Sequence, residues 1–233
     1  MTHPDRYARQ TMLAELGPAG QQRLSRSSAL IVGLGGLGSP VALYLTGAGV
    51  GRIGLCDADT VSASNLQRQT LYDETQTGMP KTVAAASRLA ALNSEVKFDQ
   101  WPQGLTPGNA RHIIAAYDIV IDCCDNFATR FLIADTCAAL EKPWVYGSIG
   151  AFHGQVTTFM PRQATGYADL YPDRQALCAI EPSHAGVLGA VPGVVGAIQA
   201  AEALKLLAQF GTTLAGRLLT INLSTMQFNT LEL

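Results

Sequence analysis

The sequence has almost no net charge and no recognisable export signal, and each shortage excludes a class of protein. Sixteen basic residues against 18 acidic ones leave a formal net charge of −2, so we expect no surface for nucleic acid or for a membrane. Residues 1–6 contain no apolar run behind a basic head, which argues against a secretory signal. The longest apolar stretch, Ser28–Val50, is interrupted by six glycines and a proline and predicts a buried strand and helix. We therefore expect a cytoplasmic protein.

No repeat, low-complexity segment or linker divides the 233 residues. Cysteine is also scarce. Five cysteines in a chain of this length indicate reduced thiols more than a disulfide framework. We expect four of them to lie in the core. These are Cys56, Cys123, Cys124 and Cys137.

Strand and helix patterns alternate from residue 28 to residue 150, which is typical of a doubly wound, Rossmann-like and mostly parallel α/β sheet. Short apolar runs and helical spacing indicate where the elements lie. The expected strands are Ser28–Val32, Arg52–Cys56, Lys97–Gln100, Asp118–Asp122 and Trp144–Gly147. The expected helices are Leu37–Ala48, Lys81–Leu92, Pro107–Ala116 and Ala128–Leu140.

The pattern changes near Ala151. The stretches "QVTTFMP" and "RLLTINLSTMQFNTLEL" predict strands of an antiparallel extension, with a long helix over Val191–Ala208 between them. We expect one domain over residues 1–233, with an N-terminal helical arm (1–27), a nucleotide-binding half (28–150) and the extension (151–233).

A glycine-rich loop follows the first expected strand. Gly33, Gly35 and Gly38 fit the pattern G-x-G-x-x-G between a strand and a helix, where backbone N–H groups approach phosphates. Asp57 ends the next strand 19 residues after Gly38, at the place of an acid that binds ribose hydroxyls. A tight turn without a ligand is the alternative; the motif in this context favours a nucleotide, either NAD or ATP.

Polar residues beyond the second strand favour ATP. "SNLQRQ" supplies Asn65, Arg68 and Gln69, and Lys81 opens the next helix; a triphosphate of about four negative charges needs such cations together with Mg²⁺. Asp125 follows another strand, where a carboxylate can hold Mg²⁺. Each residue alone also has a structural explanation, since the two cations can be solvated surface charges and Asp125 can cap a helix.

These motifs together resemble the ThiF/MoeB/HesA family, the bacterial relatives of ubiquitin-activating enzymes. The resemblance rests on "RYARQ", "VGLGGLGSPVALYLTGAGVG", "DADTVSASNLQRQ", "MPK" and "DCCDN", and runs from about Arg6 to Leu207. It implies a homodimeric enzyme that uses ATP and Mg²⁺ to adenylate the C-terminal carboxylate of a small ubiquitin-like sulfur-carrier protein ending in Gly-Gly, with release of pyrophosphate. The carrier is expected to bind residues 151–233.

The same resemblance implies the site residues. Asp125 matches the aspartate associated with Mg²⁺, and Arg9 matches an arginine that reaches the ATP of the partner subunit. The expected catalytic residues are Arg9, Arg68, Lys81 and Asp125. The expected nucleotide-binding residues are Gly33, Gly35, Gly36, Gly38, Asp57, Asp59, Asn65, Arg68, Gln69, Lys81, Asp125 and Asn126.

The chain departs from the family pattern at its structural zinc. Gly166 and Asp169 stand where many relatives have a first Cys-x-x-Cys pair, and a second pair would fall beyond Leu233. We therefore expect no zinc, and a looser or differently packed segment near residues 162–185.

A second departure concerns sulfur chemistry. Cys178 is the candidate sulfur-transfer thiol, but it lies several residues before the place of the loop cysteine in relatives, where Pro182 is closer. Only Arg174 and His184 are available to lower its pKa. We favour a buried or incidental cysteine.

The carrier is expected to serve thiamine or molybdopterin biosynthesis or a related sulfur pathway, with a cysteine desulfurase or another sulfur donor as a further partner. The segments "ALYLTGAGVG" and "LYPD" favour the thiamine type. The alternatives are a non-catalytic relative that binds nucleotide or carrier, a relative that activates a carboxylate on tRNA and, last, an NAD-dependent oxidoreductase.

Overall fold

A computed structural model describes residues 6–180 and 186–233. Its centre is an eight-stranded sheet in the order β3-β2-β1-β4-β5-β6-β7-β8. Strands β1 to β5 are parallel, and β6, β7 and β8 continue the sheet in antiparallel fashion, as predicted. The strands are β1 Ser28–Val32, β2 Arg52–Cys56, β3 Lys97–Trp101, β4 Ile119–Asp122, β5 Trp144–Gly150, β6 His153–Phe159, β7 Arg217–Asn222 and β8 Gln227–Glu232.

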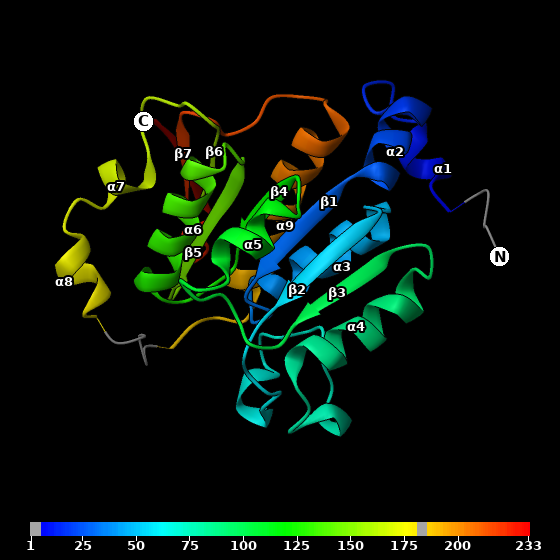
Figure 1. The fold of residues 1–233 in the computed structure, drawn as a ribbon, viewed down its shortest axis with the longest axis horizontal. Helices are drawn as coiled ribbons and strands as arrows, with labels where there is room; N and C mark the ends of the chain where they lie inside the picture. The colour runs from blue at the N-terminus through cyan, green and yellow to red at the C-terminus, as the bar shows by residue number, and fades with distance from the viewer. Residues whose placement is uncertain (1–5, 181–185) are drawn as a thin grey trace.

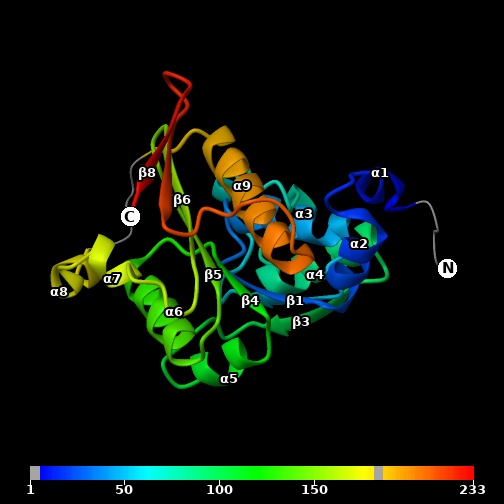
Figure 2. The ribbon, with the colours of Figure 1, turned by 90° about the horizontal axis from the view of Figure 1, so that it is seen from above.

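Helices cover both faces of the parallel part (Figure 1, Figure 2). One face carries α3 (Gly38–Ala48), α4 (Lys81–Leu92) and α9 (Ala190–Ala208), and the other carries α5 (Ala110–Ala115) and α6 (Phe127–Ala139). The central strand β1 is buried along its whole length: Ile31 packs into the first core, whereas Leu30 and Val32 pack into the second. Alternate side chains of a strand point to opposite faces, which is why such a doubly covered strand is an unbroken apolar run.

Among the described residues, α9 is long and apolar enough to cross a membrane by length and composition alone. It packs against α3, β5 and β6, and Val195, Gln199 and Ala203 on it are completely buried. Its apolar composition is therefore explained by its place in the core.

Side chains of the N-terminal arm form hydrogen bonds with the C-terminal ends of three helices. It contains α1 (Ala8–Thr11) and α2 (Gly17–Arg26). Arg6 donates to the last carbonyl of α4, Gln10 and Gln21 to the last carbonyl of α3, and Arg23 donates through two nitrogens, at 2.8 and 2.6 Å, to the last carbonyl of α9. Helix C-termini leave such carbonyls without a partner in the helix, and cations are favourable there.

Of the segment near residues 162–185, for which a looser or differently packed structure was expected, the structure describes residues 162–180. It forms α7 (Tyr167–Leu170) and α8 (Arg174–Cys178), and the Asp169 carboxylate accepts the Gly166 N–H at 2.7 Å. Tyr167 is 2% exposed, with its ring 5.0 Å from that of Phe131. An aromatic anchor therefore ties this segment to the core.

Candidate nucleotide site

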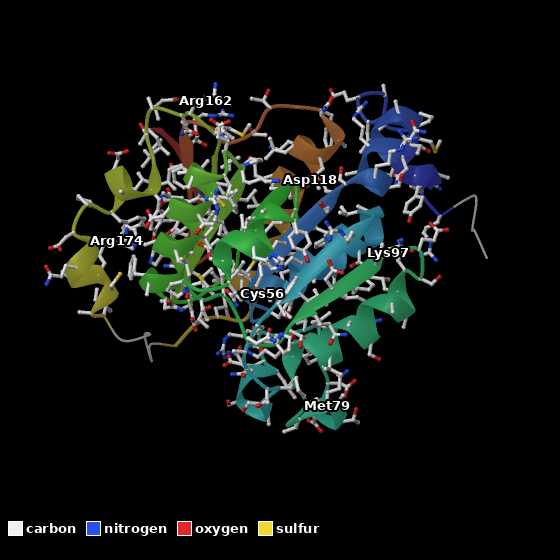
Figure 3. All side chains as sticks on the ribbon, viewed as in Figure 1. Cys56, Met79, Lys97, Asp118, Arg162 and Arg174 are labelled. Atoms are coloured by element: carbon white, nitrogen blue, oxygen red, sulfur yellow. The ribbon has the colours of Figure 1, made fainter. Side chains whose placement is uncertain are left out.

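A cavity of about 850 Å³ opens at the carboxyl ends of β1, β2 and β4. The sheet order reverses between β1 and β4, and open α/β sheets bind ligands at this position. Figure 3 shows Cys56 at the end of β2 on this edge, and Lys97 at the opposite edge. The volume lies within the range of small-molecule sites, roughly 300–1,000 Å³.

Two glycines of the glycine-rich loop have no room for a side chain. Gly33 has a φ of +92°, and a Cβ there would lie 2.6 Å from the Cys123 carbonyl oxygen, while a Cβ on Gly38 would lie 2.1 Å from the Gly33 carbonyl oxygen. Gly35 and Gly36 line the cavity, and within residues 6–180 and 186–233 their N–H groups have no protein acceptor. Two backbone donors are thus available to a phosphate, as the motif predicts.

Leu34, in the middle of this loop, is held on both sides of its backbone. The Asp57 carboxylate accepts the Leu34 N–H at 2.6 Å, and the buried hydroxyl of Tyr72 donates to the Leu34 carbonyl at 2.9 Å. Burial raises the pKa of Tyr72, so its phenol stays protonated and remains a donor. Asp57 also lines the cavity, where its remaining lone pairs can accept ribose hydroxyls.

Two cations line the same cavity. Lys81, the first residue of α4, is only 4% exposed, and its Nζ lies 2.9 Å from Asp59 Oδ2 and 3.9 Å from Asp57 Oδ2. Arg68 is half-buried, with Nη1 3.4 Å from the Ser64 carbonyl. Lys81 is therefore not the solvated surface charge that the sequence allowed as an alternative.

Asp125 is exposed and lines the cavity. The alternative that it caps a helix is wrong, because the Asn126 side chain caps α6 by accepting the Thr129 N–H at 2.9 Å. In the part of the chain that the structure describes, no three acidic, histidine or cysteine side chains form a metal site of their own. Mg²⁺ is commonly bound by one or two carboxylates together with substrate phosphates, so a single exposed carboxylate fits that ion.

Most of the residues predicted for the site meet in this cavity. Gly33, Gly35, Gly36, Asp57, Asp59, Asn65, Arg68, Lys81, Asp125 and Asn126 line it. Gln69 and Gly38 do not line it; Gln69 is buried, with Nε2 3.4 Å from where a Gly35 Cβ would lie. Arg9 is exposed and does not line the cavity. Its helix, α1, lies near the N-terminus, far from the carboxyl ends of the parallel strands (Figure 1).

Cys178 does not line the cavity, although Ile180, two residues later, does. Its thiol is exposed, so the expectation of a buried cysteine is wrong and that of an incidental one stays a prediction. Arg174 is engaged elsewhere, because its Nη1 lies 2.7 Å from Asp135 Oδ2. His184 and Pro182 lie outside the described residues.

The other four cysteines are buried as predicted. Burial raises the pKa of Cys123 and of Cys124, although both lie at the cavity. Thiols that stay protonated are poor nucleophiles, so the cavity contains no activated cysteine among the residues described.

Several residues that line the cavity were not predicted from the sequence. Gln67, Ser148 and Arg130 line it, and Arg130 is the most informative because it is 6% exposed. The motif "DCCDNFATR" places a cation soon after Asp125, which could have drawn attention to it. Its burial depends on the packing of α6 and is not visible in the sequence.

Comparison with known proteins identifies the family of this chain. The sequence pattern of the ThiF family matches residues 7–233. The chain belongs to the ThiF family. A sulfur carrier protein adenylyltransferase of Thermus thermophilus is 47% identical over 221 residues, which cover 92% of this chain and 82% of that protein.

Longer relatives share the same region. The adenylyltransferase and sulfurtransferase MOCS3 of Drosophila virilis is 45% identical over 230 residues, covering 98% of this chain and 51% of that protein. This ThiF-family chain thus spans about half the length of the MOCS3 relatives. A structure of E. coli MccB with MccA superimposes with a TM-score of 0.86 over 99% of this chain and 72% of that chain, at 21% identity, and confirms the predicted fold class.

Proposed function

We propose that this ThiF-family protein uses ATP and Mg²⁺ to adenylate the C-terminal glycine carboxylate of a small ubiquitin-like sulfur-carrier protein, with release of pyrophosphate. The predicted enzyme class, an adenylyltransferase, is confirmed by family membership and by relatives named for that activity. The carrier, the Mg²⁺ ion and the Gly-Gly tail belong to the proposal.

One observation carries the proposal: two cations and an exposed carboxylate meet around the glycine-rich loop. Arg68, Lys81 and Asp125 come from three separate segments of the chain and line the same cavity. A carboxylate that attacks an α-phosphate brings two anions together, so the barrier is largely electrostatic. Positioned cations and a bound metal ion lower it without a protein nucleophile.

ATP, when bound, would supply the adenylyl group, and the residues of this chain would bind and orient it. The backbone N–H groups of Gly35 and Gly36 would donate hydrogen bonds to phosphate oxygens. The Asp57 carboxylate would accept hydrogen bonds from the ribose hydroxyls. Asn65, Arg68 and Lys81 would contact the phosphates, while Asp125 would hold Mg²⁺.

We further propose a homodimer in which Arg9 serves the site of the partner subunit. Arg9 is exposed, and the arm that carries it is fixed to the ends of α3, α4 and α9. This arrangement suits a side chain that must be presented outward in a fixed place. The location in the cytoplasm, a cysteine desulfurase as sulfur donor, and a thiamine or molybdopterin pathway also stay proposals.

Pyrophosphate exchange tests the proposal. Labelled pyrophosphate should enter ATP only when a Gly-Gly carrier and Mg²⁺ are both present, and a carrier lacking its two terminal glycines is the matched control. Exchange that is absent with every carrier of the host, although ATP binds, would support a non-catalytic relative. Tighter binding of NAD than of ATP would favour an oxidoreductase. Exchange that requires tRNA would favour a tRNA-activating enzyme.

A further inference from the structure

Two buried side chains of opposite charge lie at the wall of the cavity, and one of them, Arg130, lines it. Asp122, the last residue of β4, is completely buried, and Arg130, the fourth residue of α6, is 6% exposed. Arg130 Nε lies 3.8 Å from Asp122 Oδ2, and neither atom has a hydrogen-bond partner among the described residues. Desolvation of a buried ion pair often cancels its Coulombic gain, so such a pair is weak evidence for stability. Its position beside the site indicates another role.

The pair holds Cys124 on both sides of its backbone. Asp122 Oδ1 accepts the Cys124 N–H at 3.0 Å and the thiol hydrogen, with Sγ at 2.7 Å. Arg130 Nη2 donates to the Cys124 carbonyl at 3.0 Å. Because this carbonyl belongs to the peptide group that joins Cys124 to Asp125, the backbone that enters Asp125 is fixed.

The rest of this turn is anchored as well. Gln199, from α9 on the other face of the sheet, donates Nε2 to the Asp122 carbonyl at 2.6 Å. The guanidinium of Arg130 lies 5.4 Å from the ring centre of Phe127 and 5.6 Å from that of Tyr146, and these rings restrict where it can move. Asp125 is therefore an exposed residue on a turn that is held from both faces of the sheet.

We propose that Asp122 and Arg130 are positioning residues, which together hold the Asp125 carboxylate in the place where it receives Mg²⁺ bound to ATP. The inference rests on the proposed function of Asp125. The pair acts on Asp125 through the backbone of Cys124. A misplacement of 1 Å in a catalytic site can cost about 100-fold in rate, so loosening this turn should lower the reaction rate measurably.

The test replaces Arg130 by Lys, which keeps the charge but not the planar fork that reaches Asp122 and the Cys124 carbonyl together. Arg174→Lys is the matched control: Arg174 also lies over a ring, 4.8 Å from that of Phe131, and pairs with an acid, but it is exposed. ATP binding is measured by calorimetry with and without Mg²⁺, and pyrophosphate exchange at saturating ATP.

Arg130→Lys should reduce the gain in ATP affinity that Mg²⁺ provides by about tenfold, and lower kcat for exchange by about 10- to 100-fold. ATP affinity without Mg²⁺ should stay within about twofold, whereas the KM for ATP measured with Mg²⁺ should rise along with the loss of affinity. Arg174→Lys should change none of these values. A folded Arg130→Lys protein that keeps the wild-type response to Mg²⁺ would refute the positioning role. Equal losses of affinity with and without Mg²⁺ would also refute it, since they would show a merely structural role.

Asp122→Asn provides a second variant, because its amide oxygen can still accept the Cys124 N–H. It should fold and lose part of the response to Mg²⁺; if neither variant folds, the pair is needed for the fold itself and the inference fails. If the wild-type protein binds Mg²⁺ and ATP together but fails to exchange pyrophosphate with any carrier tested, the proposed function is wrong. The effect of Arg130→Lys on Mg²⁺-dependent ATP binding would still be measurable in that case.

Discussion

The ammonium group of Lys81 lies 2.9 Å from the carboxylate of Asp59 and is almost completely buried at the wall of the cavity. Asp59 itself is largely exposed, with 74% of its side chain accessible. The ion pair with Asp59 thus holds the ammonium group in place, and Lys81 also lines the cavity. A buried cation with an open side suits an anionic ligand, because its attraction is screened less than at the surface.

Replacing Lys81 by Met should lower pyrophosphate exchange by about 100-fold or more, as expected when one group that stabilises developing charge is lost. Met fills similar space, so we expect the protein to fold. Lys97→Met is the matched control, since Lys97 is exposed at the start of β3, and it should exchange at the wild-type rate. Exchange in Lys81→Met within about threefold of this control would contradict the assigned role.

Asp125→Asn should abolish Mg²⁺-dependent exchange while ATP still binds in the absence of Mg²⁺. The amide keeps the shape of the carboxylate but lacks the charge that a divalent cation requires. Asp135→Asn, which removes an exposed carboxylate from α6, should leave exchange unchanged. Steady-state exchange rates measured over a range of Mg²⁺ concentrations test whether Asp125 binds this ion. Unchanged rates in Asp125→Asn would contradict that role.

Tyr167 offers a contrast between two substitutions. Its ring is buried, but its hydroxyl has no hydrogen-bond partner among the described residues. Removing an unsatisfied buried hydroxyl costs nothing, so Tyr167→Phe should leave the free energy of unfolding unchanged or raise it by up to about 1 kcal/mol. Tyr167→Ala should lower it by about 3–5 kcal/mol, because the ring anchors residues 162–180. Urea unfolding measures both; a large loss in Tyr167→Phe would show that the hydroxyl is bonded.

Buried thiols predict a loss of stability in alkali. Burial, followed by the nearby charge of Asp57, raises the pKa of Cys56 from its ordinary 9.0 to about 12. The unfolded chain then releases this proton first, so the stability from the protonated thiol is complete below pH 9 and is lost between pH 9 and 12.

Each thiol that ionises only in the unfolded state should cost about 1.4 kcal/mol per pH unit. In Cys56→Ala, the fall in unfolding free energy between about pH 9 and 11 should be shallower by that amount. Cys178→Ala removes an exposed thiol and should follow the wild-type slope. Identical slopes in all three proteins would contradict the raised pKa of Cys56.

The parts of the molecule that the sequence predicted well depend on local patterns. Strands β1 and β2 and helix α4 have the predicted bounds, because each is an apolar run or a helical repeat bounded by glycine, aspartate or proline. The site residues could be found because parallel strands end at one edge. The Tyr72 contact with Leu34 joins residues 38 apart, and the burial of Arg130 depends on α6. Neither has a local signal, so neither could be predicted.

The last prediction asks whether two subunits share one site. Arg9→Ala and Lys81→Met proteins should each exchange pyrophosphate poorly, but a mixture of the two, unfolded and refolded together, should regain activity. In a mixed dimer, the subunit with Arg9→Ala retains Lys81 and receives Arg9 from its partner, so one of two sites is complete. Random pairing makes half of the dimers mixed, and the regained activity should be about one quarter of the wild-type rate. If Arg9 serves its own subunit, no site in any dimer is complete and refolding the two together restores nothing.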